Sequence, residues 1–110
     1  MRIDIKPLSV NDAWQGKRFK TPKYKAFENE ILLKLKPMTI PDGKLAIRIV
    51  FGLSSKSSDL DNPLKTFIDC LQKRYKFNDK MIYIMEVSKD DVSKGYEFIE
   101  FEISSIEEAY

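Results

Sequence analysis

The stretch SSDLDNPLK, which ends at Lys65, places two carboxylates and a lysine at the start of an expected helix. If Asn62 is the N-cap and Pro63 the first helical residue, Asp59 and Asp61 lie on the extended segment before the helix. Residues two apart on an extended chain can point to the same side. Lys65 is then in the first helical turn, so the sequence predicts that all three charged side chains lie close together.

The chemistry expected of this group is metal-assisted reaction at a phosphate. A helix N-terminus presents free N–H groups and a partial positive charge, which favour an anionic phosphate and keep nearby carboxylates ionised. Such carboxylates need a counter-ion, and Mg²⁺ is commonly held by one or two carboxylates plus substrate phosphate. Asp79, between this helix and the next strand, can approach if that strand pairs beside residues 45–51. The predicted metal ligands are therefore Asp59, Asp61 and Asp79, with Mg²⁺ as the cofactor and Mn²⁺ as the alternative.

Each of these residues also has a purely structural interpretation. Asp59 and Asp61 are ordinary acids ahead of a helix, Lys65 a solvated helix lysine, and Asp79 a turn former beside Asn78. The combination, rather than any one residue, favours a site.

Composition limits the other chemistries. The 110 residues include no histidine and a single cysteine, Cys70, which excludes histidine bases, an intrachain disulfide and multi-cysteine zinc sites. The apolar neighbours of Cys70 indicate a buried small hydrophobe. Any catalysis must therefore use carboxylates, lysines, hydroxyls or a metal held by oxygen.

Charge is distributed unevenly along the chain. Residues 1–85 carry a net +8 and residues 86–110 a net −6. The densest basic stretch, WQGKRFKTPKYK, alternates cations with aromatic side chains, a composition typical of nucleic-acid contacts and equally compatible with a solvated lysine-rich face. The predicted DNA contacts are Trp14, Lys17, Arg18, Lys20 and Lys23, with Lys25 also in the stretch, and Lys73, Arg74 and Lys76 near the end of the second helix.

The hydrophobic pattern predicts one α+β domain over residues 1–110, a two-layer α/β sandwich in the order β-α-β-α-β-β with helices on one face of a mixed sheet. Thr21 and Pro22 begin the first helix, which stops before Pro37. Residues 7–21 are expected to be a long loop. We interpret Asp90 and Asp91 as solvated in a polar hairpin turn, and the tail as helical or frayed. The expected strands cover 2–6, 45–51, 81–87 and 96–103, the last with Glu100 and Glu102 on its solvent side.

The N-terminus has no secretory signal and no apolar run approaches bilayer thickness, so we expect a cytoplasmic protein that does not contact a membrane.

The pattern as a whole resembles the RusA family of Holliday-junction resolvases, small endonucleases often carried by prophages. The resemblance covers nearly the full chain and depends on Asp59-Leu60-Asp61-Asn62, Lys65 and Asp79, and on PLSVNDAW near the N-terminus, with Pro7, Ser9, Asn11 and Trp14 at the expected spacing.

This resemblance implies that the three aspartates bind the divalent metal, that Lys65 is catalytic, and that a homodimer cuts two opposed strands of a four-way junction. We place Asn11 with Trp14 among the DNA-contacting residues. Many members have two aspartates where this chain has Asn78-Asp79, which bears on the metal geometry.

The predicted function is therefore a metal-dependent, structure-selective endodeoxyribonuclease that acts in DNA recombination and repair. The alternative is a non-catalytic nucleic-acid-binding module with the same fold. It does not explain why carboxylates gather in a basic region, where they repel phosphate unless a cation intervenes. A third option is a nuclease with a simpler target, such as a flap or single strand.

Overall fold

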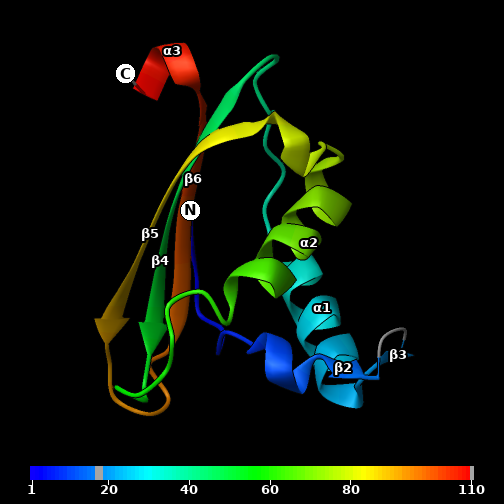
Figure 1. Cartoon of the computed structure of the whole chain (residues 1–110), viewed down its shortest axis with the longest axis vertical. Helices are drawn as coiled ribbons and strands as arrows, with labels where there is room; N and C mark the ends of the chain where they lie inside the picture. The colour runs from blue at the N-terminus through cyan, green and yellow to red at the C-terminus, as the bar shows by residue number, and fades with distance from the viewer. Residues whose placement is uncertain (17–18, 110) are drawn as a thin grey trace.

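A computed structural model describes residues 1–16 and 19–109, and its main feature is a mixed four-stranded sheet with both long helices on one face (Figure 1). The strand order is β1-β6-β4-β5, in which β5 is parallel to β4 while β6 is antiparallel to both β4 and β1. The predicted α+β class and two-layer arrangement are confirmed. The strands of this sheet are β1 Arg2–Ile3, β4 Leu45–Leu53, β5 Ile82–Asp91 and β6 Phe98–Ser105.

The helices are α1 Pro22–Lys34, α2 Leu64–Tyr75 and the short α3 Ile106–Ala109. As predicted, Thr21 caps α1, because its side chain accepts a hydrogen bond from the backbone N–H of Tyr24 (3.1 Å) and Pro22 takes the first helical position. Tyr24, Phe27 and Ile31 recur at helical spacing and are buried. This stripe attaches α1 to the sheet. Of the tail that the sequence left undecided, Ser104 and Ser105 belong to β6 and Ile106–Ala109 form α3.

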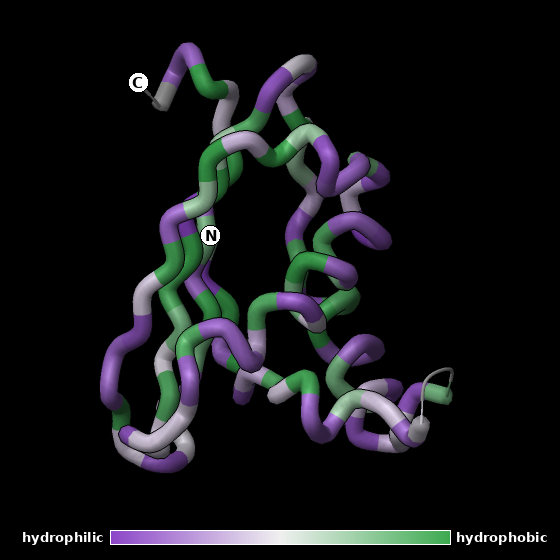
Figure 2. The backbone as a smooth tube through the Cα atoms, viewed as in Figure 1, coloured by the Kyte–Doolittle hydropathy of each residue, from purple (hydrophilic) through white to green (hydrophobic). Residues whose placement is uncertain are grey.

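The core lies between the sheet and the two long helices. Alternate residues of β4 and β6 point into it, and β4 is mostly coloured as hydrophobic in Figure 2. Phe67 of α2 packs edge-on against Phe51 of β4 and Phe101 of β6, with ring centroids 6.0 and 5.4 Å apart. Cys70 is buried, as predicted, and burial raises the pKa of its thiol to about 12. The outer positions Glu100 and Glu102 are exposed, also as predicted.

All four expected strands have different ends, and β4 runs two residues further than predicted, to Leu53. Only Arg2–Ile3 of the predicted 2–6 strand pairs with β6, because in this register Asp4 already faces Phe98, where β6 begins. The last strand starts at Phe98 and runs to Ser105, two residues later at each end than predicted.

The prediction of a polar hairpin turn at 88–95 is wrong. β5 continues to Asp91, because the backbone of β4 needs partners as far as Leu53 and polar residues can supply backbone hydrogen bonds. β4 lies between β5 and β6, so the connection between these two strands is not a hairpin. Asp90 and Asp91 are nevertheless exposed, as expected.

The predicted long loop of residues 7–21 contains secondary structure. A 3-10 turn, η1 Val10–Asp12, precedes a small two-stranded sheet of β2 Trp14–Gln15 and β3 Phe19–Lys20. The Ser9 side chain caps η1 by accepting from the N–H of Asn11 (3.2 Å). Local capping and pairing therefore order a segment whose pattern showed neither helical nor strand period.

Gly52 of β4 is required by its neighbour across the sheet. It faces Phe98, and a Cβ at Gly52 would overlap the buried Phe98 ring. We predict that Gly52→Ala lowers the free energy of unfolding by about 1–3 kcal/mol, because the ring must leave its preferred rotamer. Urea unfolding measures this, and a Phe98→Val background should remove most of the cost. An equal cost in both backgrounds would show that the overlap is not the cause.

Candidate functional site

The start of α2 is held by backbone contacts rather than by a side-chain cap. The helix begins at Leu64 with Pro63 as N-cap and no capping side chain, so the predicted Asn62 cap is wrong. The carbonyl of Asn62 instead accepts from the N–H of Val10 (2.9 Å), and the Leu64 N–H donates to the carbonyl of Asp61 (3.1 Å). Two consecutive turns over residues 59–64 thus replace the extended approach that the sequence predicted.

The Thr66 hydroxyl connects the same end of α2 to the N-terminal segment by a hydrogen bond. This hydroxyl is 2.8 Å from the carbonyl oxygen of Leu8 and 3.1 Å from that of Pro63, and the side chain is buried. With the bond between Val10 and Asn62, this connects residues 8–10 directly to the acidic segment. The PLSVNDAW and DLDN stretches are therefore in contact in the fold, which their separation in the sequence did not reveal.

Asp59, Asp61 and Lys65 are all found at this helix end, where both aspartates are on or near the surface. The Lys65 ammonium pairs with Asp69 one turn further along α2, with 3.0 Å between Nζ and Oδ1. This hydrogen bond raises the pKa of Lys65, and the charge of Asp79 acts in the same direction. Lys65 is therefore fully protonated at neutral pH.

Asp79 lies in the 3-10 turn η2 Asp79–Met81, directly before β5. Its position is fixed because its backbone N–H donates to the side-chain oxygen of Gln72 (2.9 Å) and the Asn78 side chain caps the turn. Asp79 and Lys65 line one pocket of about 300 Å³ between α2 and β5. The other walls of this pocket are mainly apolar, contributed by Leu64, Ile68, Ile82, Tyr83 and Met85.

The structure brings Asp79 to Lys65 but does not assemble all three aspartates. Within residues 1–16 and 19–109, no group of three or more His, Cys, Asp or Glu side chains is arranged to hold a metal ion. The donors are of the kind that Mg²⁺ prefers, because they are carboxylate oxygens. They are also available, because the carboxylates of Asp59, Asp61 and Asp79 form no hydrogen bond or ion pair with the described residues. The predicted metal site stays a prediction.

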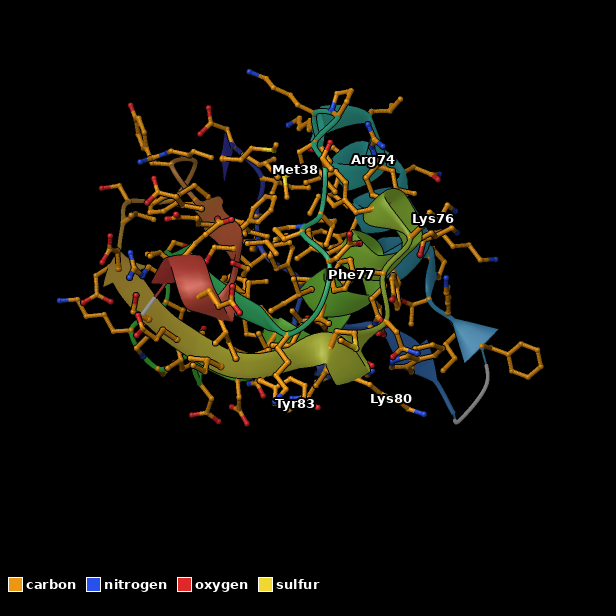
Figure 3. All side chains as sticks on the ribbon, turned by 90° about the horizontal axis from the view of Figure 1, so that it is seen from above. Met38, Arg74, Lys76, Phe77, Lys80 and Tyr83 are labelled. Carbon is orange, nitrogen blue, oxygen red and sulfur yellow. The ribbon has the colours of Figure 1, made fainter. Side chains whose placement is uncertain are left out.

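Only some of the predicted DNA contacts are free of protein partners. Lys23 is exposed, and Lys76 ends α2 in the left-handed conformation (φ 59°). The Arg74 side chain donates to the carbonyl of Leu35 at the end of α1 (3.3 Å). Figure 3 shows Arg74, Lys76 and Lys80 on the helical side of the molecule, away from α3. Lys17 and Arg18 lie outside the described residues.

Lys20 and Lys73 converge on Glu28, an interaction that sequence reasoning missed. Lys20 of β3 and Lys73 of α2 each bond a different oxygen of the Glu28 carboxylate, at 2.8 and 2.9 Å. Nothing in the local sequence signals this contact. The spacing of Lys65 and Asp69, in contrast, is that of a helical ion pair and was readable from the sequence.

Asn11 and Trp14 lie on the segment that leads to the small hairpin. Asn11 is exposed in η1. Trp14 is 37% exposed and its ring meets that of Tyr24 edge-on, with centroids 5.4 Å apart. One part of the Trp14 side chain is thus used for packing while another part still contacts solvent.

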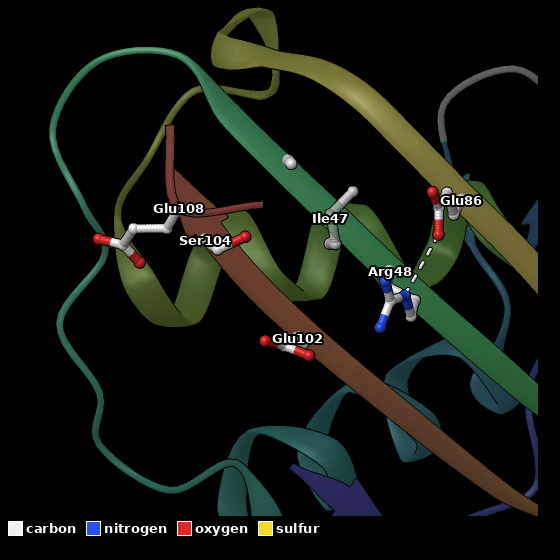
Figure 4. A pocket seen from close by; sticks show the side chains of 7 residues that line it. Ile47, Arg48, Glu86, Glu102, Ser104 and Glu108 are labelled. Atoms are coloured by element: carbon white, nitrogen blue, oxygen red, sulfur yellow. Dashed lines mark hydrogen bonds and ion pairs between the residues drawn. The ribbon is translucent and has the colours of Figure 1, made fainter. Parts of the chain in front are cut away.

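The outer face of the sheet carries acidic side chains. A second pocket, of about 330 Å³, includes Arg48, Glu86, Glu102 and Glu108 in its lining, and Arg48 Nε donates to Glu86 at 3.2 Å (Figure 4). These carboxylates disfavour a polyanion on this face. The helical side is therefore the more favourable side for nucleic acid.

Among the helices that the structure describes, none is long and apolar enough to cross a bilayer. No family model matches the sequence, and no curated protein matches it either.

Proposed function

We propose that this chain is a divalent-metal-dependent endonuclease of the RusA type, which cuts four-way DNA junctions in the cytoplasm. The observation that carries the proposal is the shared pocket of Lys65 and Asp79. Lys65 lies in the first turn of α2 and Asp79 in η2, which follows that helix, and free carboxylates of Asp59 and Asp61 lie just before α2.

The roles of the side chains follow from their charges. Asp59, Asp61 and Asp79 are the residues that would hold Mg²⁺ or Mn²⁺, and one or two carboxylates together with water and substrate phosphate suffice for such an ion. When bound, the metal supplies Lewis-acid activation of the scissile phosphate and of a water molecule. Lys65, held protonated by Asp69, provides a cation beside the phosphoryl oxygens on which negative charge develops.

The substrate is expected to approach the helical side. Exposed lysines there contact phosphates, which makes binding strongly dependent on salt and on the shape of the DNA rather than its sequence. Tyr83 lines the pocket and is 59% exposed. The Lys44 ammonium lies over one face of its ring, 4.9 Å from the ring centre, which leaves the other face for stacking an unpaired base. Two symmetric nicks require two sites, so we propose a homodimer as the active form.

The test is cleavage of an end-labelled synthetic four-way junction with Mg²⁺, with Mn²⁺ and with EDTA. Forked and linear DNA of the same sequence distinguish a resolvase from a nuclease with a simpler target. Asp61→Asn, with a gel shift to show that it still binds, assigns the activity to this site. We expect paired nicks in the junction that need metal and disappear in the variant.

Binding without cleavage by the unmodified protein, across both metals and several junction sequences, would overturn the nuclease proposal. The non-catalytic binding module would then take its place, because it accounts for the basic helical side without the metal.

A further inference from the structure

Glu28 of α1 joins two lysines that are distant in the sequence. Its Oε2 is 2.8 Å from Nζ of Lys20 on β3, and its Oε1 is 2.9 Å from Nζ of Lys73 on α2. The Glu28 side chain is only 12% exposed, whereas those of Lys20 and Lys73 are 34% and 53% exposed. The acid is therefore inside the cluster and the ammonium groups are at its surface.

The two lysines of this cluster stabilise the ionised form of Glu28. Burial alone would raise the pKa of Glu28, but the hydrogen bonds from Lys20 and Lys73 outweigh burial and the pKa is lowered. Each ammonium has three N–H donors and uses one on Glu28, so donors remain for a ligand. The Lys20 ammonium also lies 4.8 Å from the centre of the Tyr24 ring, which further restricts its position. The cluster keeps a net positive charge of one.

We propose that Glu28 is a positioning residue for DNA binding, which holds Lys20 and Lys73 side by side so that both ammonium groups contact the phosphate backbone. This inference rests on the proposed DNA-binding function. It assigns a role in that function to Glu28, although its negative charge by itself repels DNA. Glu28 also attaches β3 to the helical layer, so it fixes the hairpin that carries Trp14. Pre-arranged lysines lose less side-chain freedom when they bind.

The proposal predicts an effect opposite in sign to that of net charge. Removing an acid from a DNA-binding surface strengthens binding if only overall electrostatics matters. Removing Glu28 weakens binding if positioning matters more, because the two lysines then move independently and Lys20 is free to leave the surface.

The matched control is Glu30 on the same helix. Glu30 also pairs with a lysine, Lys34, at 2.7 Å, but both side chains are about half exposed. Glu28→Gln and Glu30→Gln make the same charge change and should both fold, as checked by circular dichroism and thermal unfolding. Binding to a labelled four-way junction is measured by fluorescence anisotropy in EDTA, where no cleavage occurs, over a series of salt concentrations.

We expect Glu28→Gln to weaken junction binding about fivefold or more and to reduce the salt slope by about one to two, because each lysine that neutralises a phosphate contributes about one to the slope. Glu30→Gln should leave the slope unchanged and the affinity equal or higher. A change of fold stability alone would not alter the salt slope of the folded protein, so the slope separates positioning from a structural role.

Three outcomes separate this inference from the function on which it rests. If Glu28→Gln binds as tightly as Glu30→Gln with the same slope, the positioning role is overturned while nuclease activity can still stand. If the unmodified protein binds and never cleaves, but Glu28→Gln loses affinity, the nuclease proposal fails and the positioning role holds. An unmodified protein that binds no junction, fork or duplex overturns both.

Discussion

Asp79→Asn should reduce metal-dependent cleavage of a four-way junction at least about 100-fold, while junction affinity changes less than about twofold. Asp79 shares a pocket with Lys65 and forms no hydrogen bond from its carboxylate to the described residues. A carboxylate held in place by its backbone and left without a side-chain partner is available to a cation. Asparagine keeps the shape of the side chain and removes its charge. We therefore expect the affinity for the metal to fall while the affinity for DNA stays nearly unchanged. Single-turnover cleavage and anisotropy measure the two quantities.

Asp90→Asn is the matched control for this prediction. Asp90 is exposed on β5, so the variant loses the same charge from the strand that follows Asp79. We expect its cleavage rate to stay within about twofold of the unmodified protein, because surface charges at a distance are screened by salt. If both variants cleave at the rate of the unmodified protein, Asp79 has no part in the chemistry.

Phe67→Ala should lower the free energy of unfolding by about 3–5 kcal/mol, a large part of the roughly 5–15 kcal/mol typical of a domain. The Phe67 ring is fully buried, and its edge-on contacts with Phe51 and Phe101 join α2 to the two central strands. Alanine leaves a cavity where the two layers meet, and α2 carries Lys65. Urea unfolding followed by circular dichroism measures the loss.

The control for this core substitution is Leu33→Ala. Leu33 lies on α1 with 88% of its surface exposed, so its removal is expected to change stability by less than about 0.5 kcal/mol. A Phe67→Ala variant no less stable than Leu33→Ala would mean that the aromatic contacts do not hold α2 to the sheet.

Much of the fold was predictable because local signals agreed with the tertiary structure. Thr21 and Pro22 indicated the start of α1, and the alternation in residues 45–51 indicated β4, one of the two central strands. The length of β5 was not predictable, because Ser88 and the residues after it are polar and pair only through their backbone with β4. The start of α2 was misassigned because Asn62, a good capping residue, uses its carbonyl to bind Val10 instead.

The candidate site, like the fold, was predictable from the sequence only in part. That Asp79 would approach Lys65 followed from the expectation that its strand pairs beside residues 45–51, and this pairing is confirmed. Glu28 could not be found, because its two lysines come from β3 and α2 and no spacing rule connects them. Interactions within one helix leave a sequence signature, whereas a bridge among three elements depends on how the helices pack.

The position of β6 has a consequence for how the chain reaches its folded state. This strand is synthesised last of the four, yet it lies between β1, the first, and β4. Pairings between such distant segments close large loops, which slows folding to the millisecond-to-second range typical of non-local topologies. A growing chain cannot pair β1 with its neighbour or cover the open edge of β4 until residues 98–105 have left the ribosome. The layer against which α2 packs is thus completed only when β6 is available, and we expect the sheet to form in one late cooperative step.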